Sequence, residues 1–271
     1  MDDDAPVESA DAQRARAADR RRPDRPRASV IGVLGEILIT VGVVVLLYVA
    51  WQMWIGDWIF GAERNAAGQE RSVEWQESYE ASDPDPLPTT EPDASGETPT
   101  TADPIILPEP ADAEVFAVMR VPRFGPDYAV EMAGGVSRAR TLDTIGIGHY
   151  PGTQMPGEPG NFAVAAHRTT WGKPFNRIAE LRVGDAIVIE TPDGWYTYRF
   201  RTLEYVRPDE VDVLLPVPQR PDIVEATTAY MTMTSCSPMF GLAERIVAYS
   251  VFESFTPRSA GPPASLTEGA A

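Results

Sequence analysis

Three side chains that could together perform nucleophilic catalysis end or begin predicted strands in the second half of the sequence. Cys236 is the only cysteine and closes the run TMTSC before Ser237-Pro238, where the proline removes a backbone donor and stops a strand. His167 ends the run NFAVAAH, and Arg245 lies nine residues after the cysteine, at the start of RIVAYSVF. A thiolate can attack a carbonyl, an imidazole can transfer the proton, and a guanidinium can hold a developing oxyanion.

The accessibility of Cys236 decides between two interpretations. A lone cysteine outside the cytoplasm is either buried and inert or retained for its nucleophilicity, and the residues alone leave both open. The only other histidine, His149, lies in the turn-rich run GIGHYPGT and is interpreted as structural.

The segment 115–256 must position these groups, and its pattern is mostly β. Short runs rich in β-branched and aromatic residues are bounded by Gly, Pro and Asp. These runs are VFAVMRV, NFAVAAH, DAIVIET, WYTYRFRTLEYV, AYMTMTSC and RIVAYSVFESF. The turn TPDG at 191–194 predicts that DAIVIE and WYTYRF form a hairpin, and helical spacing of apolar residues predicts a short helix within 173–181. Several strands with one or two short helices indicate a β-barrel or a β-sandwich.

The composition of the 271-residue chain excludes some functional classes. Its 23 Lys and Arg against 40 Asp and Glu give a net charge of −17, and so acidic a chain lacks the basic face that phosphate binding needs. We therefore expect no nucleic-acid partner. A single cysteine excludes an intrachain disulfide and a multi-cysteine zinc site. Since no acidic cluster has calcium-ligand spacing either, we expect no metal and no cofactor.

An apolar run near the N-terminus predicts a membrane anchor. ILITVGVVVLLYVAWQMWIG at 37–56 has no charge, and as a helix it spans about 30 Å. A cleaved signal peptide is the alternative, but the run exceeds the usual apolar length and no small-x-small site follows it directly. Seven arginines between Arg14 and Arg27 precede the run. The positive-inside rule therefore places 1–29 in the cytoplasm, 30–58 in the membrane and the remainder outside.

Two further segments have compositions typical of disorder. Residues 59–114 form a predicted extracellular stalk rich in proline and acids, with eight prolines between Asp83 and Pro110. Such a segment buries too little apolar surface to offset the entropy lost on ordering. Residues 257–271 are predicted to form a disordered tail.

The motifs around the three reactive residues resemble those of the sortases, the membrane-anchored cysteine transpeptidases of Gram-positive bacteria. TMTSC at 232–236, followed by Arg245, is similar to the family pattern T-L-x-T-C with an arginine on the next strand. GNFAVAAHR at 160–168 resembles G-N-x-x-I-A-G-H-R, and GIGHYPGT at 146–153 looks most like class E. The departures from the pattern are Met233 for Leu, Ser235 for Thr and Ala166 for Gly.

The resemblance implies a closed β-barrel with one or two short helices, preceded by a single transmembrane helix. It further implies that Cys236 attacks the Thr-Gly carbonyl of an LPxTG-like or LAxTG-like sorting signal on a secreted protein. A peptidoglycan precursor amine would then resolve the thioester. By the same resemblance His167 moves the protons, Arg245 holds the oxyanion, and Tyr150 lines the substrate groove as in class E; the alternative for Tyr150 is an ordinary half-buried aromatic. Ser235 is assigned to substrate binding, where its hydroxyl assists the intermediate, and the alternative is a role in packing alone.

Two rival functions remain at this stage. One is another envelope thiol transpeptidase or protease; the L,D-transpeptidase type is disfavoured because its S-x-G-C neighbourhood is absent around Cys236. The other is a non-catalytic envelope binding module in which Cys236 is a core residue. Reaction of Cys236 with a small thiol reagent separates the second rival from the enzyme.

Overall fold

The computed structural model describes residues 29–51, 57–82 and 102–269. Within them, Val30–Ala50 forms helix α2, which has no buried residue. This helix is long and apolar enough to cross a membrane and is a candidate membrane span. Residues 57 and 58 of the predicted span 30–58 belong to a second helix, which begins at Asp57, and residues 52–56 lie outside the described ranges.

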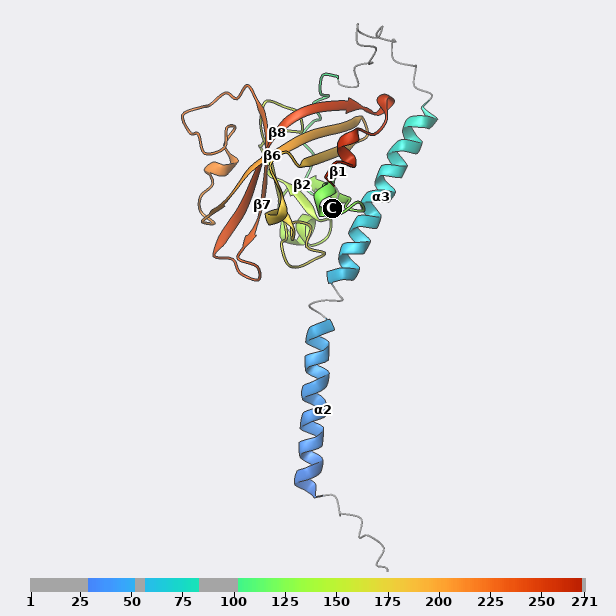
Figure 1. The fold of residues 1–271 in the computed structure, drawn as a ribbon, viewed down its shortest axis with the longest axis vertical. Coiled ribbons are helices and arrows are strands. Elements are labelled where there is room, and N and C mark those ends of the chain that lie inside the picture. The colour runs from blue at the N-terminus through green and yellow to red at the C-terminus, as the bar shows by residue number, and fades with distance from the viewer. Residues whose placement is uncertain (1–28, 52–56, 83–101, 270–271) are drawn as a thin grey trace, which may run out of the picture. The chain divides into compact units, whose positions relative to one another are not determined.

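Eight strands close into a barrel, which confirms the expected mostly β fold (Figure 1). The order around the barrel is β1-β2-β3-β4-β7-β8-β6-β5, and β5 pairs with β1 to close it. The strands are β1 Val115–Arg120, β2 Val130–Gly134, β3 Ile147–His149, β4 Gly160–Ala166, β5 Ala186–Thr191, β6 Gly194–Val206, β7 Ala229–Ser237 and β8 Glu244–Pro257. All six predicted runs are strands, and β5 and β6 form the predicted antiparallel hairpin.

Short helical turns fill most of the connections. Those between strands are η2 Pro122–Phe124, the π-helical η3 Arg138–Leu142, η4 Ile178–Glu180 and η5 Asp212–Leu214, whereas η6 Arg258–Ala260 and η7 Ala264–Leu266 follow β8. The helix predicted within 173–181 is thus the single turn η4. The inward-pointing residues of the strands form one core, which includes Phe162, Tyr196, Tyr198, Met231, Met233 and Phe255. Each fully buried side chain of this size contributes roughly 1.5–3 kcal/mol.

Strand pairing places the three predicted reactive residues side by side. Strands β4 and β7 run parallel, and Ala165 pairs with Thr234. Two residues further along each segment, His167, which directly follows β4, therefore lies opposite Cys236. On the other side of β7, Cys236 pairs directly with Arg245 of the antiparallel β8. Since adjacent residues of a strand point to opposite faces, Cys236 points away from the core residue Met233 and toward the outside of the barrel.

Part of the predicted stalk is instead a long helix that packs on the barrel. Helix α3 spans Asp57–Ala81 and contains no proline; the first proline of the predicted stalk is Pro84, which follows the helix. The face of α3 that docks on the barrel is polar: Asn65 accepts a hydrogen bond from the Ala129 amide, and Gln69 donates to the Asp127 carbonyl. A Cβ on Gly68 would lie 2.3 Å from the Ala129 carbonyl oxygen, so the two backbones approach closely.

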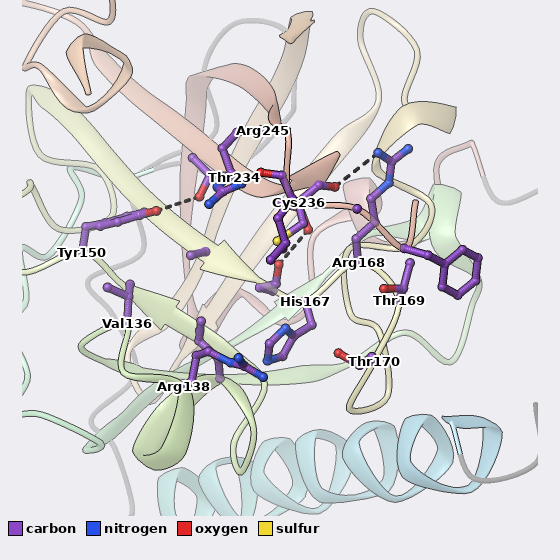
Figure 2. Close-up of a pocket in the computed structure, with 17 residues that line it drawn as sticks. Val136, Arg138, Tyr150, His167, Arg168, Thr169, Thr170, Thr234, Cys236 and Arg245 are labelled. Carbon is purple, nitrogen blue, oxygen red and sulfur yellow. Dashed lines mark hydrogen bonds between the residues drawn. The ribbon is translucent and has the colours of Figure 1, made fainter. Parts of the chain in front are cut away.

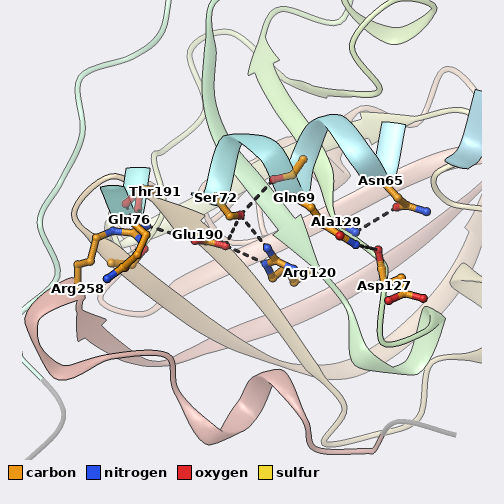
Figure 3. A network of polar contacts seen from close by, with 12 residues as sticks. Asn65, Gln69, Ser72, Gln76, Arg120, Asp127, Ala129, Glu190, Thr191 and Arg258 are labelled. Carbon is orange, nitrogen blue, oxygen red and sulfur yellow. Dashed lines mark hydrogen bonds and ion pairs between the residues drawn. The ribbon is translucent and has the colours of Figure 1, made fainter. Parts of the chain in front are cut away.

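A buried carboxylate joins α3, the barrel and the C-terminal segment (Figure 3). Glu190 of β5 is 3% exposed and pairs with Arg120 at 2.8 Å and Arg258 at 3.3 Å. Ser72 of α3 donates to the same carboxylate at 2.8 Å. Arg258 also stacks over the Trp195 ring at 4.7 Å. Partners on three segments offset the cost of burying these charges.

The rest of the predicted stalk and tail is also ordered where it is described. Residues 102–114 lie along the barrel, with Ala102 bridged to Phe255 and Asp112 bridged to Gly134. The tail predicted to be disordered over 257–271 instead begins with the last residue of β8 and continues through η6 and η7. Both predictions of disorder rested on composition, which does not report the contacts that these segments make with the surface of the barrel. Residues 83–101 of the predicted stalk lie outside the described ranges.

Candidate active site

The three predicted reactive residues line one cavity at the ends of β4, β7 and β8 (Figure 2). Its volume is about 610 Å³. The exposed apolar side chains of Phe240 and Leu242, in the β7–β8 connection, form part of its wall. The cavity is thus large and apolar enough to accept a short peptide segment.

Cys236 is a half-buried free thiol on the penultimate residue of β7. Its backbone carbonyl accepts a hydrogen bond from Nη1 of the buried Arg168 at 3.3 Å. Arg168 directly follows His167 in the sequence, so one short segment both carries the imidazole and holds the cysteine backbone. The residue is partly exposed, so Cys236 is not a core residue.

His167 is oriented by a carboxylate. Its Nε2 lies 2.6 Å from Oδ1 of Asp143, which follows η3, and both side chains are largely buried. Because a carboxylate only accepts hydrogen bonds, Nε2 carries the proton and donates it to Asp143. Nδ1 is then the ring atom that can take up or release a proton during a reaction. Arg138 of η3 lies 3.8 Å from the same carboxylate.

Arg245 lies at the start of β8 with its guanidinium tied to its own turn. Nη1 donates to the carbonyls of Leu242 at 3.2 Å and Glu244 at 2.9 Å. Within the described part of the chain both hydrogen bonds use Nη1, so Nε and Nη2 remain as donors. A half-buried guanidinium opposite the thiol can stabilise negative charge that develops on a substrate carbonyl.

The two predicted substrate contacts occupy different surroundings. The Tyr150 hydroxyl lies 3.0 Å from Oγ1 of Thr234, which is two residues before Cys236 on β7, and both residues line the cavity. Ser235 is buried, and its hydroxyl donates to the Ala166 carbonyl at 2.7 Å. That bond ties β7 to β4 and engages the hydroxyl proton. A contact of Ser235 with substrate stays a prediction.

His149 is built into the barrel. It is fully buried, stacks on Phe162 with ring centroids 5.4 Å apart, and its Nε2 lies 2.9 Å from the Thr153 hydroxyl. Burial lowers the pKa of His149, while hydrogen bonds to Gln154 and Thr153 and the charge of Glu109 oppose this effect. These surroundings agree with a structural role.

Sequence reasoning missed Asp143 and gave Arg168 no role of its own. Asp143 is 24 residues from His167 and ends an irregular π-helical turn, so no spacing rule connects the two. The described residues contain no group of three or more His, Cys, Asp or Glu side chains that could hold a metal ion.

Comparison with known proteins agrees with this geometry. Residues 119–253 match the family model of the sortase domain. Sortase SrtE1 of Streptomyces coelicolor is 32% identical over 262 residues, which cover 93% of this chain and 66% of that protein. Sortase SrtE2 of the same organism is 32% identical over 238 residues, which cover 85% of each.

A solved structure supports the same relationship. The crystal structure of sortase E1 from Streptomyces coelicolor, which holds a tripeptide in its active site, is 34% identical and superposes with a TM-score of 0.53. The match covers 58% of this chain and 99% of that one. The chain therefore belongs to the sortase family of cysteine transpeptidases and is most similar to its class E members.

Proposed function

We propose that this chain is a membrane-anchored transpeptidase that cleaves an LPxTG-like or LAxTG-like sorting signal between Thr and Gly and transfers the acyl group to a cell-wall amine. The observation that carries the proposal is the arrangement of Cys236 between His167 and Arg245 on three adjacent strands, at the wall of a cavity of about 610 Å³. The tripeptide in the active site of the related sortase E1 supports a peptide substrate.

The first half of the reaction forms a thioester. The Cys236 thiolate attacks the threonine carbonyl carbon, and the carbonyl electron pair moves onto oxygen, where the free donors of Arg245 stabilise it. The intermediate collapses with cleavage of the C–N bond. His167 gives its Nδ1 proton to the departing glycine nitrogen, so the product leaves as a neutral amine.

The second half reverses the order of these steps. The acceptor amine attacks the thioester carbonyl and loses a proton to Nδ1 of His167. The C–S bond then breaks, which restores the Cys236 thiolate and the protonated imidazole. One amide bond is exchanged for another, and neither water nor an oxidant is consumed.

The location of the reaction follows from the N-terminal region. The candidate span α2 follows seven arginines, so the N-terminus is cytoplasmic and the barrel is extracellular. A membrane-impermeant maleimide tests this orientation, because Cys236 is the only thiol of the chain. We expect labelling in intact, wall-stripped cells and none in a Cys236→Ala control. Labelling of the wild type only after lysis contradicts the orientation.

The reaction itself is tested with the full chain in lipid vesicles. Peptides containing LPxTG or LAxTG are supplied with a glycine peptide as acceptor, and products are identified by mass spectrometry. We expect the Thr-acceptor product and a thioester adduct on Cys236, and neither with the Cys236→Ala variant. Hydrolysis without transfer indicates a protease, and an unreactive Cys236 with no turnover indicates a binding module.

A further inference from the structure

We propose that Arg64 of helix α3 supports the reaction, because it holds Asp143 in the position from which the Asp143 carboxylate orients His167. Arg64 and Asp143 are then positioning residues for the reaction. The inference rests on the proposed function in that it assigns the same proton-transfer role to His167.

Arg64 reaches from α3 to the β2–β3 connection and binds the Asp143 backbone. Its side chain is 9% exposed, and Nη2 donates to the Asp143 carbonyl at 2.7 Å. The Asp143 carboxylate in turn lies 2.6 Å from Nε2 of His167. Two short hydrogen bonds therefore connect α3 to the imidazole.

The barrel leaves room for this arginine. A Cβ on Gly146 would lie 3.0 Å from Nη1 of Arg64, and a Cβ on Gly172 would lie 2.9 Å from its Cδ. Both glycines have a positive φ that other residues rarely adopt. Side chains at either position would displace the guanidinium.

The beginning of α3 also contacts the segment that carries His167. The ring of Phe60 lies 6.0 Å from that of Trp171, and a Cβ on Gly61 would be 3.4 Å from the Gly172 carbonyl oxygen. Trp171 and Gly172 directly follow Thr170, which lines the catalytic cavity. One end of α3 thus packs against both the imidazole segment and the carboxylate segment.

This arrangement matters because His167 must present Nδ1 to two successive amines. Rotation of the ring exchanges the two nitrogens, and the hydrogen bond from Nε2 to Asp143 opposes that rotation. Asp143 follows a π-helical turn, an irregular element whose position is set by its contacts. Arg64 supplies such a contact at the backbone of Asp143 itself.

The first test observes the imidazole directly and needs no substrate. The chain has two histidines, so ¹⁵N-selective NMR of labelled full-length protein in nanodiscs gives few imidazole N–H signals, and His167→Gln assigns one of them. We expect the Nε2–H signal of His167 to be protected in the wild type. It should exchange with water faster in Asp143→Ala and in Arg64→Gln.

The second test is a double-mutant cycle in the transpeptidation assay. A misplaced catalytic group can cost on the order of 10²-fold in rate, so we expect Asp143→Ala to lower kcat about 100-fold and Arg64→Gln about tenfold, with KM nearly unchanged. Because Arg64 acts through Asp143, adding Arg64→Gln to Asp143→Ala should lower kcat no further. Arg64→Lys keeps a charged donor and should recover part of the loss.

Arg71→Gln is the matched control on the same helix. Arg71 pairs with Glu131 at 3.0 Å and does not contact Asp143, so it tests the docking of α3 alone. We expect this variant to keep a wild-type kcat.

The inference is overturned if Arg64→Gln leaves the His167 signal unchanged, if its loss of kcat is no larger than that of Arg71→Gln, or if the losses of the two single variants multiply in the double variant Arg64→Gln/Asp143→Ala. Should Arg64→Gln fail to fold, Arg64→Lys and Asp143→Ala replace it in both tests. A wild-type protein without transpeptidation refutes the proposed function. The NMR experiment needs no substrate, so it still tests whether Arg64 and Asp143 position His167.

Discussion

Replacement of Arg245 by lysine or by alanine shows whether its role depends on the geometry of the guanidinium or only on its positive charge. If the guanidinium holds the oxyanion through its planar fork, Arg245→Lys should be nearly as harmful as Arg245→Ala, because an ammonium keeps the charge but not the geometry. We expect each variant to lose about 10²- to 10³-fold in kcat/KM, the range observed when one oxyanion donor is removed, which corresponds to roughly 2.7–4 kcal/mol.

The structure predicts a small effect of the same substitutions on stability. Both hydrogen bonds of Arg245 go to carbonyls of its own exposed turn, Leu242 and Glu244. Water can replace the guanidinium there, so the free energy of unfolding should fall by no more than about 1 kcal/mol. For a domain of this size, that is a Tm decrease of about 2–4 °C.

The assay combines kcat/KM for peptide transfer with a thermal melt, and Arg207→Ala is the control. Arg207 is an exposed arginine that pairs with Asp209 at 3.4 Å outside the cavity, so its loss should affect neither quantity. Accumulation of the thioester, measured by intact mass, shows whether acylation or resolution is slowed. Near-normal transfer by Arg245→Lys together with early unfolding of Arg245→Ala would refute the oxyanion role and make Arg245 a structural residue.

Three further predictions concern specificity, the buried ion cluster and pH. Tyr150→Glu should lower the preference for Ala over Pro at the second substrate position about tenfold in the ratio of kcat/KM, since one pocket contact is worth roughly 1–3 kcal/mol; an unchanged ratio removes Tyr150 from the site. Glu190→Ala leaves the buried Arg258 without its carboxylate and should cost about 3–5 kcal/mol of unfolding free energy, whereas Glu180→Ala, whose carboxylate is 52% exposed, should cost less than about 1 kcal/mol in the same denaturant titration. Because burial lowers the pKa of His149 in the folded state, the unfolded chain binds this proton more readily, so the contribution of His149 to stability should be fully present above pH 6.5 and be lost as the pH falls below it. A His149→Gln variant that loses Tm as steeply as the wild type between pH 6.5 and 5 contradicts this.

The strands and the family could be predicted because their signals are local. Alternating β-branched and aromatic residues indicated six of the eight strands, and Pro238 indicated the end of β7 beside Cys236. The two strands that were missed, β2 and β3, have five and three residues, which is too short for a periodic pattern. Motifs around Cys236, His167 and Arg245 indicated the family, since they preserve residue types at fixed spacing.

Helix α3 could not be predicted because its docking face is polar. Asn65, Gln69 and Ser72 recur at helical spacing and bind the barrel through hydrogen bonds, whereas a periodicity search looks for apolar residues. The C-terminal segment was missed for a related reason. Arg258 is 3% exposed because Glu190 and Trp195 surround it, and neither partner is near it in the sequence.

The sequence alone therefore indicated the family and predicted a thiol, an imidazole and a guanidinium at strand ends, after a candidate membrane span. Folding decided how these groups are held. The parallel register of β4 and β7 places His167 beside Cys236, and packing of an irregular turn and a helix places Asp143 and Arg64 behind the imidazole. Such contacts join residues that are 24 and 79 positions apart, and their energy depends on burial and distance, which only the closed barrel creates.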